Sequence, residues 1–458
     1  MMDAATAAGA MHGRLHGANV RFGRVTTDTR ALAPGDLFVA LKGEQFDGHD
    51  FVTAAFERGA AAALVADDRA DASGGPLIAV ADPLTALGRL ATHWRRQFAL
   101  PVIVVAGSNG KTTVKEMLAA ILCAEFGAAA VHATRGNLNN AIGLPLTVLG
   151  LRAHHRAAAI ELGMNHPGET AVLAAIAQPT IAIVNNAQRE HQEFMQGTAA
   201  VAEEHAALVR ALAAGGTAVL NADDAHVGVW RDAARERAAT VVEFALDQPA
   251  AVAGRFVPAA GAGSLLLSTP QGEAAVRLSV PGRHNAANAL AATAAALAAG
   301  VALAAVARGL EAFRPSAGRL VTRTARSGAV VIDDTYNANP DSVRAAIAVL
   351  AGMPGPKCLV LGDMGEVGAQ GPAFHHEIGE YARAKGIDRL LAVGALAAAS
   401  AAAFGAGALH FTSVEALAQH AAATVGGATT VLVKGSRFMR MERVVAALTG
   451  DTPDAGAH

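Results

Sequence analysis

The 458-residue sequence has little cysteine, few aromatic side chains and almost no net charge. Two cysteines, Cys123 and Cys358, exclude a disulfide framework and fit a reducing compartment. The formal net charge of −2 argues against a protein that binds nucleic acid or a membrane surface by charge. Aromatic residues reach only 4%, but the hydrophobic content of 52%, rich in alanine, excludes global disorder.

One uncharged segment, residues 289–307, is long enough to be compared with a membrane span. It consists mostly of alanine and contains Thr293 and Gly300, so we interpret it as a buried or half-buried helix of a globular protein. The first residues carry Asp3 and lack the apolar core of a signal peptide. We therefore expect a cytoplasmic protein without membrane insertion.

Short β-branched runs alternate with alanine-rich stretches, which is typical of α/β units around parallel sheets. Strands are expected near residues 101–106, 158–161, 181–184 and 217–220 and, in a second set, near 329–333, 358–361, 390–393 and 430–434. A helical region at 285–311 separates the two sets. At roughly 150 residues per domain the length fits three α/β domains, which we place at 1–98, 99–313 and 314–458.

A glycine-rich turn follows the first strong strand and opens a helix. Glycines let backbone N–H groups turn toward phosphate oxygens, and the helix N-terminus adds its partial positive charge. Lys111 would reach the β- and γ-phosphates, and the Thr112 hydroxyl would bind Mg²⁺. The full pattern begins with a glycine where this chain has Val105, and a turn with an exposed lysine is the plain alternative. The position between strand and helix favours a nucleotide-binding loop of Gly107, Ser108, Asn109, Gly110, Lys111, Thr112 and Thr113.

Polar residues follow other predicted strands as well. Because ligands of open α/β sheets bind at the carboxyl ends of strands, Glu161 is placed to hold Mg²⁺ against nucleotide phosphates. His191 follows another strand end; a solvated carboxylate and a structural histidine are the alternatives for these two residues. Asp334 and Asn337 indicate a second ligand-facing crevice, and Asn285 has helix capping as its alternative. We interpret the doublets His154-His155 and His375-His376 as surface residues.

At this point the sequence resembles the Mur ligase family over nearly its whole length. The motifs that carry the resemblance occur in family order and at family spacing. They are Thr27-Asp28-Thr29-Arg30, the runs 34–44 and 46–50, the phosphate loop, Gly136-Asn137-Leu138-Asn139-Asn140, and the clusters at Glu161, Asn185, Asn285, Arg319, Asp334 and Gly362.

The resemblance implies a role for each matching position. The first domain would hold the UDP-sugar end of a substrate, the central domain would be an ATPase-like phosphate-loop domain, and the Rossmann-like last domain would close on ATP. Lys111, Glu161 and His191 would be catalytic, with Thr112, Glu161 and His191 holding Mg²⁺. The implied nucleotide contacts are the phosphate loop with Asn285, Arg319, Asp334 and Asn337, and the implied substrate contacts are Thr27, Asp28, Thr29, Lys42, Gly43, Asn137, Asn139 and Asn140.

Within the family, the run from Asp333 to Pro340 is similar to that of the branch that adds D-alanyl-D-alanine to UDP-N-acetylmuramoyl-tripeptide. The resemblance thus implies an ATP- and Mg²⁺-dependent amide ligase of peptidoglycan precursor synthesis that works through an acyl phosphate, and we expect a monomer. The ligase that adds the third residue and folylpolyglutamate synthetase are the alternatives inside the family. A phosphotransferase or simple ATPase and a non-catalytic nucleotide sensor are the alternatives outside it.

One position departs from the family pattern. Family members commonly carry a carbamylated lysine that supplies a magnesium ligand, and counting from His191 that position here is His205. A neutral imidazole can bind a divalent metal but does not replace the lost negative charge. Our hypothesis is that a second magnesium ion is held differently, with help from Glu204.

Overall fold

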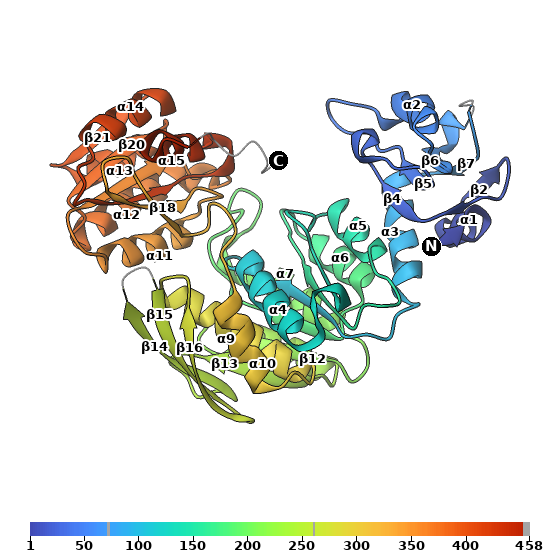
Figure 1. Ribbon diagram of the computed structural model, residues 1–458, viewed down its shortest axis with the longest axis horizontal. Coiled ribbons are helices and arrows are strands. Elements are labelled where there is room, and N and C mark those ends of the chain that lie inside the picture. Colours follow the sequence, from blue (N-terminus) through green and yellow to red (C-terminus); the bar gives the residue numbers. More distant parts are fainter. Residues whose placement is uncertain (71–73, 260–261, 452–458) are drawn as a thin grey trace.

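The computed structural model describes residues 1–70, 74–259 and 262–451 as three α/β domains, each around its own sheet (Figure 1). The first sheet has the order β2-β7-β6-β5-β4, and β2 is its antiparallel member. Its strands are β2 (Arg14–His16), β4 (Arg24–Thr26), β5 (Asp36–Val39), β6 (Ala62–Ala66) and β7 (Leu77–Val80), with a separate pair β1 (Met2–Asp3) and β3 (Arg21–Phe22). The helices are α1 (Ala4–Met11), α2 (Val52–Glu57) and α3 (Pro83–Arg95).

The central sheet has nine strands in the order β16-β15-β14-β13-β12-β11-β8-β10-β9. It is parallel from β9 to β14, and β15 and β16 extend it as an antiparallel hairpin. The bounds are β8 (Val102–Ala106), β9 (Val131–Ala133), β10 (Ala157–Glu161), β11 (Ile181–Val184), β12 (Thr217–Asn221), β13 (Thr240–Ala245), β14 (Val252–Ala259), β15 (Ala262–Thr269) and β16 (Gly272–Leu278).

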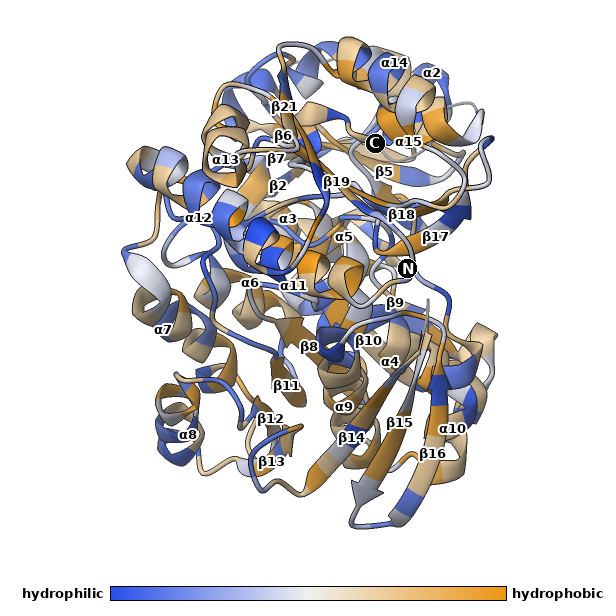
Figure 2. Ribbon diagram, turned by 90° about the vertical axis from the view of Figure 1, so that its left-hand side faces the viewer, coloured by the Kyte–Doolittle hydropathy of each residue, from blue (hydrophilic) through white to orange (hydrophobic). Residues whose placement is uncertain are grey.

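Helices cover both faces of this sheet, so its inner strands read as continuous apolar runs (Figure 2). On β8, Val102, Val104 and Ala106 belong to the core formed with one helix layer, and Ile103 and Val105 to the core on the other face. The first layer is α5 (Gly143–Leu149), α6 (Glu169–Ala177), α7 (Gly197–Arg210) and α8 (Val227–Glu236); the second is α4 (Lys111–Phe126), α9 (Arg283–Ala298) and α10 (Leu303–Ala312).

The last sheet has the order β17-β18-β22-β19-β20-β21, with β17 antiparallel to the rest. Its elements are β17 (Val321–Thr324), β18 (Val330–Asp334), β19 (Lys357–Gly362), β20 (Arg389–Val393), β21 (Ala408–Phe411) and β22 (Thr430–Lys434), with α11 (Pro340–Ala351), α12 (Gly371–Ala384), α13 (Ala397–Phe404), α14 (Val414–Thr424) and α15 (Glu442–Thr449). Asn339 caps α11 with a capping box and Pro340 takes the first helical position.

The structure confirms the three-domain α/β class and the predicted strands, but it divides the predicted helical region 285–311. Gly300 has φ +81° after α9 ends at Ala298, and α10 begins at Leu303. A left-handed residue ends an α-helix, so the uncharged run becomes two short helices. Among the described residues, no helix is both long and apolar enough to cross a membrane.

Candidate active site

The phosphate loop joins β8 to α4, and its backbone conformation requires glycine at two positions. Gly107 has φ +139° and Gly110 has φ +83°, values that side-chain-bearing residues rarely adopt. A Cβ atom on Gly107 would lie 2.9 Å from Cβ of Asn185, and one on Gly110 would collide with the Asn185 and Asn288 amides. The loop is therefore a close-fitting turn that points the N-terminus of α4 at one spot, as anion binding requires.

Lys111, the first residue of α4, folds back over this turn. Its Nζ donates to the carbonyl oxygens of Gly107 (2.5 Å) and Ser108 (3.1 Å) and to Oε2 of Glu190 (3.2 Å). The side chain is only 17% exposed, so its charge is concentrated on the loop. The ammonium group thus lies at the place where a phosphate group would be received.

Glu161 ends β10, beside the phosphate loop, as the sequence predicts. It is buried, and its Oε1 accepts a hydrogen bond of 2.7 Å from Asn139 Nδ2. Its Oε2 has no hydrogen-bond partner. A buried carboxylate oxygen without a partner is costly unless a cation or donor reaches it, which is what a magnesium ligand requires.

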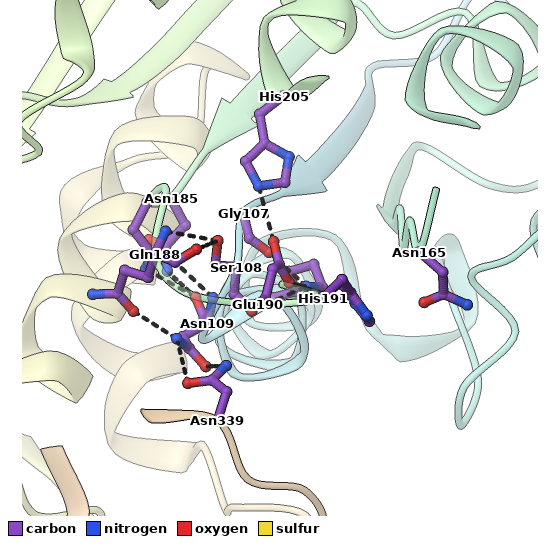
Figure 3. A network of polar contacts seen from close by, with 12 residues as sticks. Gly107, Ser108, Asn109, Asn165, Asn185, Gln188, Glu190, His191, His205 and Asn339 are labelled. Carbon is purple, nitrogen blue, oxygen red and sulfur yellow. Dashed lines mark hydrogen bonds and ion pairs between the residues drawn. The ribbon is translucent and has the colours of Figure 1, made fainter. Parts of the chain in front are cut away.

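The segment after β11 brings Glu190, His191 and His205 together (Figure 3). His205 Nε2 on α7 lies 3.2 Å from Glu190 Oε1, and His191 Nε2 lies 3.9 Å from Glu190 Oε2. Burial opposes ionisation of Glu190, but the charges of Lys111 and the histidines outweigh it and hold the pKa of this carboxyl at about 2. His191 has φ +46°, and its Nδ1 lies 2.7 Å from Oε2 of Glu366 in the last domain.

The last domain reaches the loop through several polar side chains. Arg319 donates to Thr112 Oγ1 (2.8 Å) and lies over the ring of Tyr336. The amides of Asn109 and Asn339 exchange two hydrogen bonds across the domain boundary (Figure 3). Nearby, Lys434 Nζ on β22 contacts Asp334 Oδ2 at 2.6 Å and donates to the Asn337 carbonyl.

A ladder of asparagine amides supports the loop from behind. Asn185 Nδ2 donates to the Asn109 carbonyl and to Asn288 Oδ1. Asn288 in turn donates to Asn285 Oδ1, and Asn285 donates to the Pro281 carbonyl. Asn285 and Asn288 are buried in α9, whose N-cap is Gly282, so Asn285 is not a helix cap. Instead it fixes the Asn288 amide, which contacts Asn185 behind the phosphate loop.

These groups face one cavity of about 1260 Å³ between the central and last domains. Most of the predicted site residues line it, namely Ser108, Asn109, Gly110, Lys111, Thr112, Thr113, Asn137, Asn139, Asn140, Glu161, His191, Asn285, Arg319, Asp334 and Asn337. Gly107 lies underneath, where its carbonyl accepts from Lys111. The other five predicted residues, Thr27, Asp28, Thr29, Lys42 and Gly43, lie in the first domain on loops after the parallel strands β4 and β5.

The structure corrects the expectation for Glu204. Its carboxylate accepts the backbone N–H groups of Gly168 (2.9 Å) and Thr170 (2.8 Å) at the start of α6, and it does not line the cavity. Sequence reasoning instead passed over Glu190, which does line it. Its position one residue before His191, after a strand end, was the available signal. Among residues 1–70, 74–259 and 262–451, no three His, Cys, Asp or Glu side chains form a group that could hold a metal ion by themselves.

A phosphate loop faces a cavity between two α/β domains, with a further α/β domain beside them, and this arrangement suits the binding of a nucleotide. Three family descriptions match consecutive parts of the chain: "Mur ligase family, catalytic domain" at residues 21–95, "Mur ligase middle domain" at 105–296 and "Mur ligase, glutamate ligase domain" at 318–437. The chain belongs to the Mur ligase family.

Three relatives within that family are ligases of one kind. The chain is 42% identical to the UDP-N-acetylmuramoyl-tripeptide--D-alanyl-D-alanine ligase of Escherichia coli K12, over 96% of each protein. A crystal structure of MurF from Acinetobacter baumannii matches with a TM-score of 0.91 and 34% identity, covering 98% of this chain and 100% of that one. The MurF ligase of Thermotoga maritima in complex with ADP matches with a TM-score of 0.82 and 26% identity, covering 93% and 97%.

Proposed function

We propose that this chain joins D-alanyl-D-alanine to UDP-N-acetylmuramoyl-tripeptide and consumes ATP, giving UDP-N-acetylmuramoyl-pentapeptide, ADP and phosphate. One observation carries the proposal: a single cavity is lined by the phosphate loop, by the loop around Asn137–Asn140 and by the last domain. Such a reaction needs a nucleotide, a carboxylate and an amine at one place, and the cavity has three sides that can each present one of them. The names of the relatives support the identity of the two acyl and amine substrates.

The chemistry proceeds by activation of a poor acyl donor. A carboxylate oxygen of the tripeptide attacks the γ-phosphorus of ATP, and the bond to the ADP oxygen breaks. The amine of the dipeptide then attacks the acyl carbon, phosphate leaves, and the amine loses a proton as the amide forms. No side-chain nucleophile is required, because the phosphate group itself is the leaving group.

The phosphate loop supplies stabilisation of charge. The backbone N–H groups at the N-terminus of α4 and the Lys111 ammonium face the transferring phosphoryl group, whose oxygens carry the developing charge. For this, Lys111 must leave the carbonyls of Gly107 and Ser108 that it contacts in this structure. Arg319 and Asn337 line the same cavity from the last domain, and in this proposal they hold the nucleotide.

Magnesium fits the residues present. Glu161 offers a buried, unpartnered oxygen, and Thr112 and His191 line the same cavity. We propose that these three residues hold Mg²⁺, which when bound neutralises charge on the phosphate oxygens. The small number of protein ligands agrees with the usual mode of Mg²⁺ binding, in which phosphates and waters complete the shell.

The three domains divide the work in this proposal. Residues 1–98 hold the UDP end through Thr27, Asp28, Thr29, Lys42 and Gly43; residues 99–313 bind ATP; and residues 314–458 close over it and receive the dipeptide. Asn137, Asn139 and Asn140 lie between the first two sites. Closure keeps the acyl phosphate from water, since that intermediate would otherwise hydrolyse.

The test is phosphate release with ATP, Mg²⁺ and UDP-N-acetylmuramoyl-tripeptide, with and without D-alanyl-D-alanine. We expect release only with the dipeptide, together with a UDP-pentapeptide detected by mass. Release without any acceptor would make the chain an ATPase, and release with a UDP-dipeptide and a single amino acid would move it to another branch.

Two variants separate the sites. Lys111→Ala should lower kcat by about a hundred- to a thousandfold, because it removes the positive charge that stabilises the transferring phosphoryl group. Lys42→Ala should raise KM for the UDP substrate and leave KM for ATP unchanged. Lys385→Ala, at an exposed position at the C-terminal end of α12 and outside the cavity lining, is the matched control and should behave as the unmodified protein.

A further inference from the structure

Among the described residues, Glu190 is the one buried carboxylate of the cavity wall to which the mechanism above gives no role. Its side chain is 5% exposed, and three potential cations surround its two oxygens: Lys111, His191 and His205. A buried carboxylate is stable only while a positive group or hydrogen-bond donors compensate its charge. Its surroundings must therefore remain cationic in every state of the catalytic cycle.

Lys111 cannot compensate Glu190 throughout the cycle. In this structure its Nζ lies 3.2 Å from Glu190 Oε2. When nucleotide phosphates draw the ammonium group toward the cavity, Oε2 loses that cation. Oε1 keeps its contact with His205, whose ring is 1% exposed and held in α7, so the carboxylate itself stays in place. An oriented carboxylate oxygen is then left facing the phosphates, beside His191.

We propose that Glu190 is a metal ligand: it binds a divalent cation that arrives with the nucleotide, in exchange for the Lys111 ammonium. His205 is a positioning residue that holds Oε1 so that Oε2 faces the cation. The inference rests on the proposed function, because it adds a ligand to the magnesium site of that reaction. The Glu190 carboxylate would take the place of the carbamylated lysine that family members commonly have at the position of His205. Unlike a carbamylated lysine, it needs no carbon dioxide to form.

The chemistry of the donor set agrees with this exchange. Mg²⁺ prefers carboxylate oxygens and keeps several waters and phosphate oxygens, so one fixed carboxylate is a sufficient contribution from this side. The neighbouring Nε2 of His191 lies 3.9 Å from Oε2 of Glu190, close enough for both side chains to face one ion.

The experiment measures Mn²⁺ binding by electron paramagnetic resonance, in the presence of saturating ADP, for the full chain. Glu190→Gln keeps the size of the side chain and removes its charge. It should weaken Mn²⁺ binding at least about tenfold, because even residues that only support a metal ligand are worth about that much and Glu190 is proposed to be a ligand itself. Glu190→Asp keeps the charge and should weaken it less. Glu193→Gln, in the same segment but exposed, is the matched control and should bind Mn²⁺ as the unmodified chain does.

A second measurement distinguishes metal binding by Glu190 from a role limited to its ion pair with Lys111. If Glu190 only pairs with the lysine, Glu190→Gln will leave Mn²⁺ affinity unchanged and strengthen metal-free ADP binding, because Lys111 is released; that result overturns the proposal. His205→Ala should lower Mn²⁺ affinity, and His205→Gln, whose amide can donate to Oε1, should restore most of it.

The failure of this inference differs from failure of the proposed function. If the unmodified chain retains no Mn²⁺ with ADP, the magnesium-dependent reaction itself is wrong. If it retains Mn²⁺ and both Glu190 variants bind equally well, only the assignment of Glu190 is wrong. Should Glu190→Gln not fold, which circular dichroism will reveal, Glu190→Asp provides a different test: its shorter carboxylate should still weaken Mn²⁺ binding relative to the unmodified chain, and equal binding would overturn the proposal.

Discussion

The central domain meets its two neighbours through joints of different chemistry. Toward the first domain the joint is apolar: α3 packs against α5 and α6, and the buried core of the first domain is continuous with that on one face of the central sheet. Trp94 is buried there and donates to the Leu151 carbonyl, and Arg95 donates to carbonyls of Ala177 and Gln178.

Toward the last domain the joint is polar. Arg189, which directly precedes Glu190, contacts Asp341 of α11 and Glu377 of α12, each at 2.6 Å at the closest approach. The Asn109–Asn339 amide pair and the His191–Glu366 contact lie beside it. Among the described residues, the hydrophobic cores of the last domain contain no residue of the central domain.

The difference shows which joint can open. Separating an apolar core costs a free energy of about 25 cal/mol for each Å² of apolar surface that becomes exposed to water. Charged and amide groups lose little net free energy on separation, because water replaces their hydrogen-bond partners. We therefore expect the first domain to stay fixed to the central one and the last domain to be able to close and release. Each prediction below acts on one of the two joints.

The largest effect is expected in the apolar joint. Trp94→Ala should lower the free energy of unfolding by about 3–5 kcal/mol, because it removes a large buried ring and its hydrogen bond. Urea unfolding followed by circular dichroism measures it. Arg96→Ala, exposed and two residues away, is the control; a change below about 1 kcal/mol for Trp94→Ala would show that this joint is not a shared core.

In the polar joint, Arg189→Met should favour the open arrangement by about 1–2 kcal/mol, since partly exposed charged contacts are lost. We expect a larger radius of gyration with nucleotide bound, and a fall in kcat, with little change in thermal stability. Arg344→Met also loses a contact to Glu377 but within the last domain, and should leave the radius unchanged. Equal behaviour of the two variants would contradict a bridging role.

Asn339 contributes both to a helix cap and to the polar joint. Asn339→Ala should cost about 1 kcal/mol of stability through the lost cap of α11 and should also weaken ADP binding. Asn339→Ser keeps a capping oxygen but not the amide pair, so it should recover the stability and not the ADP affinity. Calorimetric titration with ADP and thermal unfolding separate the two.

The smallest effect is a pH dependence of the polar joint alone. The hydrogen bond from Arg189 holds the pKa of Glu377 below its ordinary value of 4.5, and His191 does the same for Glu366. Because these carboxyl groups have a lower pKa in the closed form, their ionisation stabilises closure at any pH above the ordinary pKa. This stabilisation is lost as the pH falls through the lowered pKa. Scattering between pH 6 and pH 3.5 should show expansion only below about 4.5, before any loss of the α3 joint.

The sequence predicted what depends on local pattern. The phosphate loop and the strand ends at Glu161 and Asp334 follow from residue types in order along the chain. Contacts between domains could not be obtained in this way, because Arg189 meets Asp341 and Glu377 only through the fold. His375, expected at the surface, is instead buried: its ring accepts from the Met364 N–H and contacts the Gly371 carbonyl. The buried face of α12 includes His375, whereas His376 is exposed. A pair of adjacent histidines in the sequence does not reveal which of the two faces inward.

The division of β8 between two cores restricts how this loop can vary. Alternate side chains of the strand belong to opposite layers of helices, so inserting or deleting one residue would send every apolar group to the wrong layer. A change in the length of β8 is therefore not a tolerated way of moving the loop. Change must come from the side chains around it, the asparagines below and the acidic and basic groups beside it, which can be replaced one at a time.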